Sequence, residues 1–293
     1  MAKLLLGREV ADALAADLTF RVEQLQRSGV DPALTIIRLG EKAGDMSYEK
    51  GARNRAAQLG VRVNTLALPE TTTVEELMDT IDRLNDDAKV HGVLLLRPLP
   101  EHMRDRKQEI FNHLVPEKDV DGMTDISAAG VYTGQGQGFP PCTPAACMEM
   151  LDHYGIVVTG KKALVMGRSM VVGRPAAMML LKRDATISMV HTRTDDPHAY
   201  IPNTDILICA AGVKNLITGD MVRPGQVVLD VSMNYDPEKI TPRGKGGMVG
   251  DCDFAAVEPI VEAITPVPGG VGAVTNTVLM KHVIEAAEKS LEQ

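Results

Sequence analysis

The sequence contains no tryptophan, and only 3% of its 293 residues are aromatic. There is therefore little material for the aromatic platforms that stack on the bases of single-stranded nucleic acids. Basic residues are also fewer than acidic ones. The chain has 31 lysines and arginines and 39 aspartates and glutamates, which gives a net charge of −8. A nucleic-acid-binding domain usually carries a basic surface, so we expect no nucleic-acid partner.

Cysteines and long apolar runs are scarce as well. The four cysteines form no C-x-x-C pair and are too few for a disulfide scaffold, so we expect buried, reduced thiols and no metal site. No run approaches about eighteen apolar residues, the length that spans a membrane. The leucine run at residues 4–6 ends at Gly7 and is too short for a signal peptide. We therefore expect a cytoplasmic protein that does not bind membranes.

The first part of the chain alternates helical and strand periods. Apolar residues recur every three or four positions in its helical stretches, and apolar runs between them indicate strands covered on both faces. This β-α-β-α-β order predicts an open parallel α/β unit, followed by an irregular segment over 99–141. The expected strands are 33–40, 61–68 and 93–96, and the expected helices are 10–25, 45–59 and 74–84.

A second α/β unit begins near Thr143 and Pro144, which are a good N-cap and first helical residue. We expect a Rossmann-like, doubly wound parallel sheet here, and a last helix that packs on the first domain. The predicted domains are 1–143 plus 270–293 and 144–269. The expected strands are 163–167, 186–190, 205–210 and 227–231, and the expected helices are 143–154, 173–182 and 275–291.

A glycine turn follows the first strand of this second unit. Gly167 ends the strand, Arg168 and Ser169 follow, and Gly173 opens a helix. Glycines in such a turn let the backbone bend and the helix pack closely, while the helix N-terminus offers N–H groups to a pyrophosphate. The spacing G-x-S-x-x-x-G differs from G-x-G-x-x-G. The motif indicates a phosphate-binding turn because a strand precedes it and a helix follows it. An ordinary βα turn is the alternative.

The next strand bears on the choice between NAD and NADP. An NAD site usually places an Asp or Glu at the end of this strand, about twenty residues beyond the glycines, to bind the ribose 2′-hydroxyl. Here the strand is followed by His191, Thr192 and Arg193, with no carboxylate. Arg193 and Arg168 supply positive charge for a 2′-phosphate, so NADP is favoured over a reading in which both are merely solvated. Met233 completes the predicted cofactor set.

Five segments together resemble the methylenetetrahydrofolate dehydrogenase/methenyltetrahydrofolate cyclohydrolase family. They are Tyr48 on the second helix, P-L-P at 98–100, D-V-D-G at 119–122, G-R-S-M-V-V-G-R-P at 167–175 and P-V-P-G-G-V-G at 266–272. The resemblance implies a homodimer of two-domain subunits, with NADP on the second domain and folate in a cleft between the domains. It also implies roles for Tyr48 and Asp121 as catalytic and pterin-binding residues. The loop residues that it places around folate are Pro268, Gly269, Gly270, Val271 and Gly272.

The sequence departs from this family at two positions. The family pattern Y-x-x-x-K reads Tyr48 to Ala52 here, so Ala52 stands at the lysine position. Lys50 lies about 200° around the helix from Tyr48 and cannot simply substitute. Leu96 stands at the position of the family's glutamine, and Arg97 follows it. We expect Ala52, Leu96 and Arg97 to shape the pocket around the reacting carbon.

These departures bear differently on the two reactions of the family. Hydride transfer needs positioning, because the folate nitrogens stabilise the cation that forms. Hydrolysis of the methenyl product needs water to be added and protons to be moved by a group of suitable pKa. The sequence therefore predicts an NADP-dependent dehydrogenase with weak or absent cyclohydrolase activity. The alternatives are a bifunctional enzyme with a replacement group, a non-catalytic folate- or nucleotide-binding paralogue, and an oxidoreductase with a shifted substrate.

Overall fold

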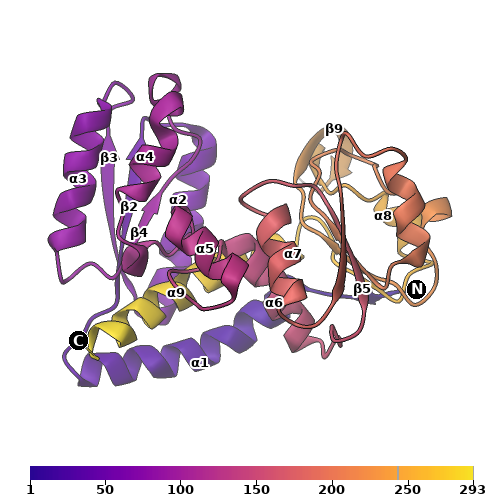
Figure 1. The fold of residues 1–293 in the computed structure, drawn as a ribbon, viewed down its shortest axis with the longest axis horizontal. Helices are drawn as coiled ribbons and strands as arrows, with labels where there is room; N and C mark the ends of the chain where they lie inside the picture. The colour runs from indigo at the N-terminus through magenta and orange to yellow at the C-terminus, as the bar shows by residue number, and fades with distance from the viewer. Residues whose placement is uncertain (243, 293) are drawn as a thin grey trace. The chain divides into compact units, whose positions relative to one another are not determined.

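The computed structural model describes residues 1–242 and 244–292. These residues form two compact units, each built around its own parallel sheet (Figure 1). Unit 1 comprises Met1–Asp12 and Thr143–Thr275, and unit 2 comprises Ala13–Cys142 and Asn276–Gln293. The α/β class and the Rossmann-like sheet are thereby confirmed. None of the described helices is both long and apolar enough to cross a bilayer.

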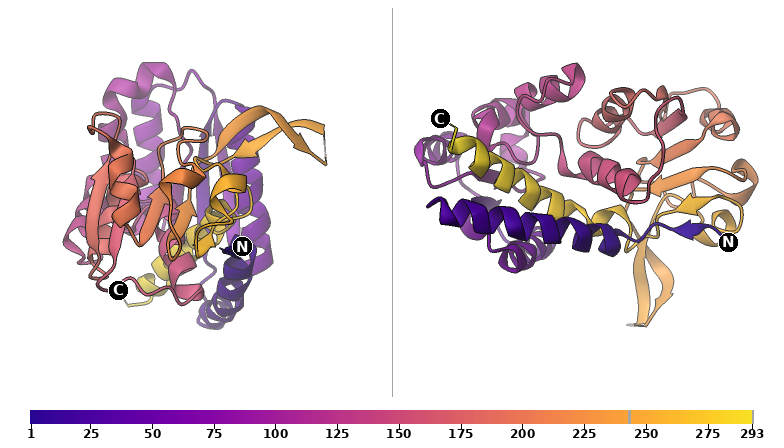
Figure 2. Two further views of the ribbon diagram at one scale, coloured as in Figure 1. Left: turned by 90° about the vertical axis from the view of Figure 1, so that its right-hand side faces the viewer. Right: turned by 90° about the horizontal axis from the view of Figure 1, so that it is seen from below.

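Unit 2 is a three-stranded parallel sheet in the order β3-β2-β4. All seven residues of the central strand β2 are buried, which explains its unbroken apolar character. Helix α3 begins with a capping box between Thr73 and Glu76. Helices α1 and α9 run side by side, joined by an ion pair of 2.6 Å between Arg21 and Glu288 (Figures 1 and 2). The bounds are α1 Gly7–Arg27, β2 Ala33–Leu39, α2 Ala43–Leu59, β3 Arg62–Leu68, α3 Val74–Asp86, β4 Gly92–Leu95 and α9 Thr275–Ser290.

Unit 1 is a six-stranded sheet in the order β1-β11-β8-β7-β5-β6, and all its neighbours are parallel. Strand β5 has β6 on one side and β7 on the other, so the winding of the sheet reverses beside β5. In open α/β sheets a ligand binds outside the carboxyl ends of the strands at such a point. The bounds are β1 Lys3–Leu4, α6 Cys142–His153, β5 Lys162–Met166, α7 Gly173–Leu181, β6 Thr186–Val190, β7 Ile206–Cys209, β8 Val227–Asp230, α8 Phe254–Val257 and β11 Ala263–Ile264.

The structure adds elements that the sequence pattern did not predict. The stretch expected to be irregular contains the short helices α4, Lys107–Asn112, and α5, Asp125–Thr133, together with two 3-10 turns. Strands β9, Asn234–Thr241, and β10, Gly244–Val249, form an antiparallel hairpin that projects away from the sheet of unit 1 (Figure 2). Strand β1 pairs with β11, which is why the first residues of the chain group with the second sheet.

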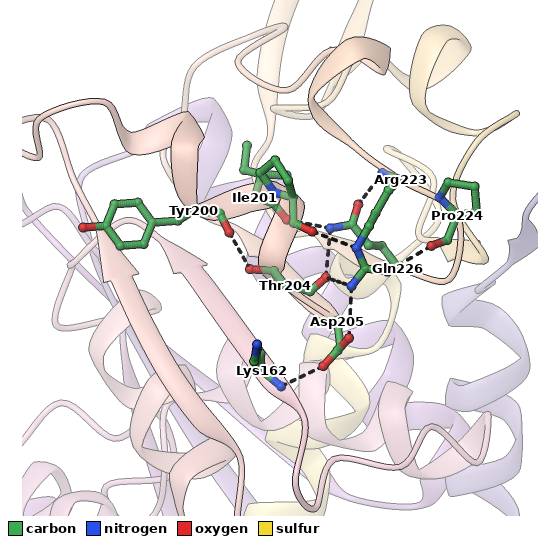
Figure 3. Close-up of polar contacts among 9 residues, drawn as sticks. Lys162, Tyr200, Ile201, Thr204, Asp205, Arg223, Pro224 and Gln226 are labelled. Atoms are coloured by element: carbon green, nitrogen blue, oxygen red, sulfur yellow. Dashed lines mark hydrogen bonds and ion pairs between the residues drawn. The ribbon is translucent and has the colours of Figure 1, made fainter.

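A polar network ties together the amino ends of β5, β7 and β8 in unit 1 (Figure 3). Arg223 donates to the carbonyl of Thr204 at 2.9 Å and to the carboxylate of Asp205 at 3.1 Å. Asp205 also accepts the backbone N–H of Lys162, and buried Gln226 donates to the Thr204 carbonyl. These contacts hold the strand edge opposite the carboxyl ends, so we assign them to stability and not to a ligand.

Candidate active site

The two aspartates of the D-V-D-G turn in unit 2 have different tasks. Asp119 is fully buried, and its carboxylate accepts the backbone N–H groups of Met123 and Thr124 at 2.8 Å and the hydroxyl of Ser127 at 2.6 Å. It therefore fixes the turn and the start of α5. Within residues 1–242 and 244–292, no backbone N–H is bonded to Asp121. Of the two carboxylates, Asp121 is the one that is available to another side chain or a ligand.

Arg97 contacts that carboxylate. It lies two residues beyond the end of β4, and its Nη2 is 2.5 Å from Oδ2 of Asp121. The Asp121 side chain is 11% exposed and that of Arg97 is 27% exposed. Burial raises the pKa of the Asp121 carboxyl, and the positive charge of Arg97 opposes that rise. The structure thus pairs two of the predicted site residues directly.

Tyr48 belongs to the same cluster. It is half-buried on α2, and burial raises the pKa of its phenol strongly. The nearby Cys142 and Asp121 raise this pKa further, whereas Arg97 lowers it. Tyr48 therefore stays protonated and offers an aromatic face and a hydroxyl beside the Arg97–Asp121 pair.

Helix α2 is held in place by the residue after Tyr48. The carboxylate of Glu49 accepts the guanidinium of Arg38 on β2 at 3.0 Å, that of Arg53 at 3.1 Å and the hydroxyl of Thr65 on β3 at 2.8 Å. These partners lower the pKa of Glu49 against the opposing effect of its burial. The network joins α2 to two strands and so fixes the direction in which Tyr48 points.

Ala52 and Leu96, which we expect from the sequence at the lysine and glutamine positions of the resembled family, are both buried. Ala52 is 0% exposed and Leu96 is 7% exposed. Helix α2 is unbroken through Gly51, and Lys50 is exposed on it. Local unwinding that would bring the Lys50 amine beside Tyr48 is therefore not found.

The remaining predicted folate residues lie in unit 1, on the loop before α9. Gly270 and Val271 are buried, while Pro268, Gly269 and Gly272 are exposed. Gly269 has a φ of +106°, and a Cβ on Gly270 would lie 2.6 Å from the carbonyl oxygen of Pro266, so neither position accepts a side chain easily. Met233, placed in the cofactor set, approaches this loop: a Cβ on Gly272 would lie 3.7 Å from its Sδ.

The glycine turn after β5 sits at the point where the winding reverses. Gly167 has a φ of +118°, and a Cβ there would lie 2.3 Å from the carbonyl oxygen of Ala210, beyond β7. A Cβ on Gly173 would lie 2.2 Å from the carbonyl oxygen of Gly167. Both glycines are therefore required by close backbone approach. The hydroxyl of Ser169 accepts the N–H groups of Val172 at 3.0 Å and Gly173 at 3.4 Å, so it holds the turn that leads into α7.

Positive charge gathers at the ends of β5 and β6. These strands are parallel neighbours, with Met166 paired to Val190, so Arg168 and Arg193 follow the same edge of the sheet. Both arginines are exposed, as is Thr192, and among the described residues neither guanidinium forms an ion pair. Asp196, three residues after Arg193 in the sequence, caps a 3-10 turn by accepting the backbone N–H of Ala199. The edge offers cations for an anionic group.

Sequence reasoning missed Asp251, which organises this carboxyl edge. It is fully buried, and its carboxylate accepts the backbone N–H groups of Ala211 at 2.8 Å and Val213 at 2.8 Å. It also accepts the hydroxyl of Ser232 at 2.8 Å and the amide of Asn234 at 3.1 Å. One carboxylate thus joins the loops after β7 and β8. An aspartate between a glycine and a cysteine gives no sequence signal for this role.

A doubly wound parallel sheet with a glycine turn at its reversal point defines a dinucleotide-binding α/β protein. Two family sequence models place the chain more narrowly. The catalytic domain of tetrahydrofolate dehydrogenase/cyclohydrolase matches residues 5–121, and the NAD(P)-binding domain of the same family matches residues 141–291. The chain belongs to the tetrahydrofolate dehydrogenase/cyclohydrolase family.

Similar proteins cover the whole chain. A bifunctional protein FolD of Carboxydothermus hydrogenoformans is 43% identical over 98% of this chain and 98% of its own. A crystal structure of the bifunctional enzyme FolD from Campylobacter jejuni is 35% identical, covers 99% of both chains and superposes with a TM-score of 0.92. The Trypanosoma brucei enzyme, complexed with NADP cofactor and inhibitor, is 32% identical, covers 100% of this chain and 99% of its own, and has a TM-score of 0.91.

Proposed function

We propose that this chain oxidises 5,10-methylenetetrahydrofolate to 5,10-methenyltetrahydrofolate with NADP, in cytoplasmic one-carbon metabolism, and hydrolyses the product weakly or not at all. Membership of the family supports the dehydrogenase reaction. The observation that carries the second half is Ala52, a buried methyl group four residues after Tyr48 on an unbroken helix. A homodimer remains a prediction from the family resemblance.

The residues of unit 1 fit NADP. Gly167 and Gly173 leave room for close backbone approach, and Arg168 and Arg193, which form no ion pair among the described residues, supply cations at the same sheet edge for a 2′-phosphate. Thr192 and Ser169 add hydroxyls, and Met233 lies near the loop at Gly272, where a Cβ would be 3.7 Å from its Sδ. Bound NADP supplies the hydride acceptor. The named relative from Trypanosoma brucei, which binds NADP, supports the same assignment.

The residues of unit 2 fit one end of a folate. Asp121 presents a buried carboxylate that suits the N–H donors of a pterin, and Arg97 fixes its orientation. Tyr48 supplies an aromatic face from α2. Positioning by these groups suffices for hydride transfer, because the folate nitrogens carry the positive charge that develops.

Hydrolysis of the methenyl product requires a proton-accepting group that hydride transfer does not require. Water must add to the methenyl carbon, and a group must accept a proton from it. Ala52 and Leu96 have no atom that can do so. Arg97 is no substitute as a base, because a guanidinium stays protonated in proteins and this one is paired with Asp121.

The names of the relatives favour a second candidate, a bifunctional enzyme with a replacement group. Proteins called bifunctional are 41–43% identical to this chain. Asp121 is the described group best suited to replace the lysine, since burial raises the pKa of its carboxyl and so makes it a better proton acceptor once ionised. Its pairing with Arg97 works against that role.

The test follows both products at once. Purified protein with methylenetetrahydrofolate and NADP should form NADPH and methenyltetrahydrofolate in equal amounts, and the methenyl absorbance should then decay only at the rate without enzyme. The double change Ala52→Lys with Leu96→Gln should accelerate that decay. Ser47→Lys, which adds a lysine to an exposed position of α2, is the matched control and should not.

Two results would reject the proposal. Absence of NADPH formation would exclude the dehydrogenase, and methenyl decay well above background in the unmodified protein would establish the bifunctional alternative. A lysine at a fully buried position can prevent folding, so the ratio of the two products in the unmodified protein decides the question even if the double variant is insoluble.

A further inference from the structure

The start of α9 carries an asparagine, Asn276, whose side-chain carbonyl has no hydrogen-bond partner among the described residues. The side-chain oxygen of Asn276 is buried, and in the described part of the chain it accepts no hydrogen bond. An unpaired buried carbonyl costs about 1–3 kcal/mol, so such a group is normally either paired or used. Nothing in the family resemblance assigned this residue a task.

The position of the Asn276 amide is informative. A Cβ built on Gly51 would lie 2.8 Å from its Nδ2, so the amide rests directly against the backbone of α2 at Gly51. Residues 48, 51 and 52 share one face of a helix, because positions three and four apart are neighbours. The amide therefore lies on the face that carries Tyr48 and the buried methyl of Ala52.

Gly51 and Ala52 together make room for this amide. A larger residue at Gly51 would collide with it, and no long side chain stands at Ala52 to occupy the same face. The two small residues on α2 and the polar residue on α9 thus form a single arrangement within unit 2.

Resting on the proposed function, we propose that Asn276 is a folate-binding residue whose carbonyl accepts a hydrogen bond from a donor that arrives with the folate. Two donors have this chemistry: a ring N–H of the pterin, or a water molecule held at the reacting carbon. A carboxamide does not titrate, so in either case Asn276 orients its partner and does not move a proton.

Two variants test the proposal from opposite sides of the contact. Asn276→Ala removes the carbonyl. Gly51→Ala leaves Asn276 intact but displaces its amide, because the new methyl group would lie within 3.0 Å of a movable side chain. Gly44→Ala is the matched control, since the same change in α2 meets no atom within 4 Å.

The kinetic measurements are kcat and KM for methylenetetrahydrofolate and KM for NADP. Binding of 5,10-methenyltetrahydrofolate, and the rate at which this compound decays in the presence of the enzyme, are measured separately. If the donor is a ring N–H, both variants should raise the folate KM about tenfold, as expected for a lost hydrogen bond of about 1.4 kcal/mol, and leave the NADP KM unchanged. If the donor is a water molecule, the KM for methylenetetrahydrofolate should stay constant and binding of 5,10-methenyltetrahydrofolate should weaken in both variants. Gly44→Ala should match the unmodified protein.

Unchanged folate KM, folate binding and methenyl decay in both variants would overturn the inference. If the unmodified protein binds 5,10-methenyltetrahydrofolate but turns nothing over, the proposed function fails while the binding comparison still tests Asn276. If it binds no folate at all, both proposals fall together.

Discussion

At the scale of single residues, the Arg97–Asp121 pair changes the charge of the candidate folate site. A carboxylate alone would give the site a negative charge, whereas the pair is neutral and holds the carboxylate in one orientation. The groups that face Asp121 besides Arg97 are Asp119, Cys142 and Tyr48, and none of them supplies a second cation. Arg97 is therefore the cation that opposes the rise of the Asp121 pKa on burial.

Replacing Arg97 by leucine should make folate binding depend on pH. Without the cation the pKa of Asp121 rises further, so the ionised form that binds pterin N–H groups is reached only at higher pH. We expect the folate KM of Arg97→Leu to rise at least about tenfold at neutral pH and to improve as pH increases. KM measured from pH 5.5 to 8.5 checks this. Arg104→Leu, at an exposed ion pair, is the control, and a parallel profile for both variants would contradict the role of Arg97.

Arg168→Ala should separate the two dinucleotides. The exposed Arg168 is free to bind a 2′-phosphate, which NAD lacks, so the variant should raise the KM for NADP about tenfold or more and leave the KM for NAD nearly unchanged. Steady-state kinetics with both cofactors measure this. Arg183→Ala, which breaks a surface ion pair with Asp152 in the same unit, should change neither KM. Equal losses for NADP and NAD would show that Arg168 acts on the pyrophosphate or the fold.

At the level of residues, the sequence is most informative where a backbone constraint fixes the residue type, although cofactor binding by such residues stays a prediction. Gly167 and Gly173 are examples, because the close approaches at both positions exclude a Cβ. The partner of Arg97 could not be predicted. Strand alternation gives only the side of the sheet, and Arg97 lies beyond the last residue of β4, where alternation no longer applies.

At the scale of elements, unit 1 has a polar network at each edge of its sheet. Asp251 joins the loops at the carboxyl ends of β7 and β8, and Arg223 joins the amino ends. Both networks satisfy buried backbone groups, so both stabilise the unit. Only the network of Asp251 shapes the edge at which a dinucleotide is expected.

Substitutions in the two networks should therefore differ in their effect on NADP. Asp251→Asn turns an amide toward backbone N–H donors and should lower the free energy of unfolding by roughly 2–3 kcal/mol while raising the KM for NADP. Arg223→Leu should also lower the free energy of unfolding, with an unchanged KM. Urea unfolding and cofactor titration give the two quantities. The same KM in both variants would show that Asp251 is only structural.

The long elements were predictable because their apolar periods are strong, as in β2 and α3. The hairpin of β9 and β10 was not, since Asp236 is its only buried residue among those described and its sequence contains proline, lysine and three glycines. Short helices such as α4 and α5 carry too few residues for a period to appear. Thr124 caps α5 through Ser127, which is a local contact that no apolar pattern records.

At the scale of the whole molecule, acid stability should depend on a buried histidine in unit 2. Burial lowers the pKa of His282 to about 4 from the usual 6.5, and its Nδ1–H donates to the carbonyl of Val120 at 2.9 Å. Between these two pH values the unfolded chain binds a proton that the folded chain does not. Folding is therefore destabilised as pH falls from 6.5 to 4, by roughly 3 kcal/mol from this group.

The variant His282→Asn keeps a donor for Val120 but does not titrate. Between pH 6.5 and 4 the free energy of unfolding should decrease in both proteins. The decrease should be smaller in the variant, by roughly 3 kcal/mol. Urea unfolding at several pH values measures the difference. Parallel pH dependences would show that His282 is not the group responsible.

The division into two units also has a consequence for synthesis on the ribosome. The chain passes from unit 1 to unit 2 after Asp12, returns at Thr143 and leaves again after Thr275. Strand β1 has its sheet partner only when β11 emerges, and unit 2 lacks the buried face of α9 until that helix has been synthesised. At about 5–20 residues per second, the first strand waits roughly 10–50 s for its neighbour. Premature termination before α9 would leave unit 2 with an uncovered apolar core, a species prone to aggregation and to capture by chaperones.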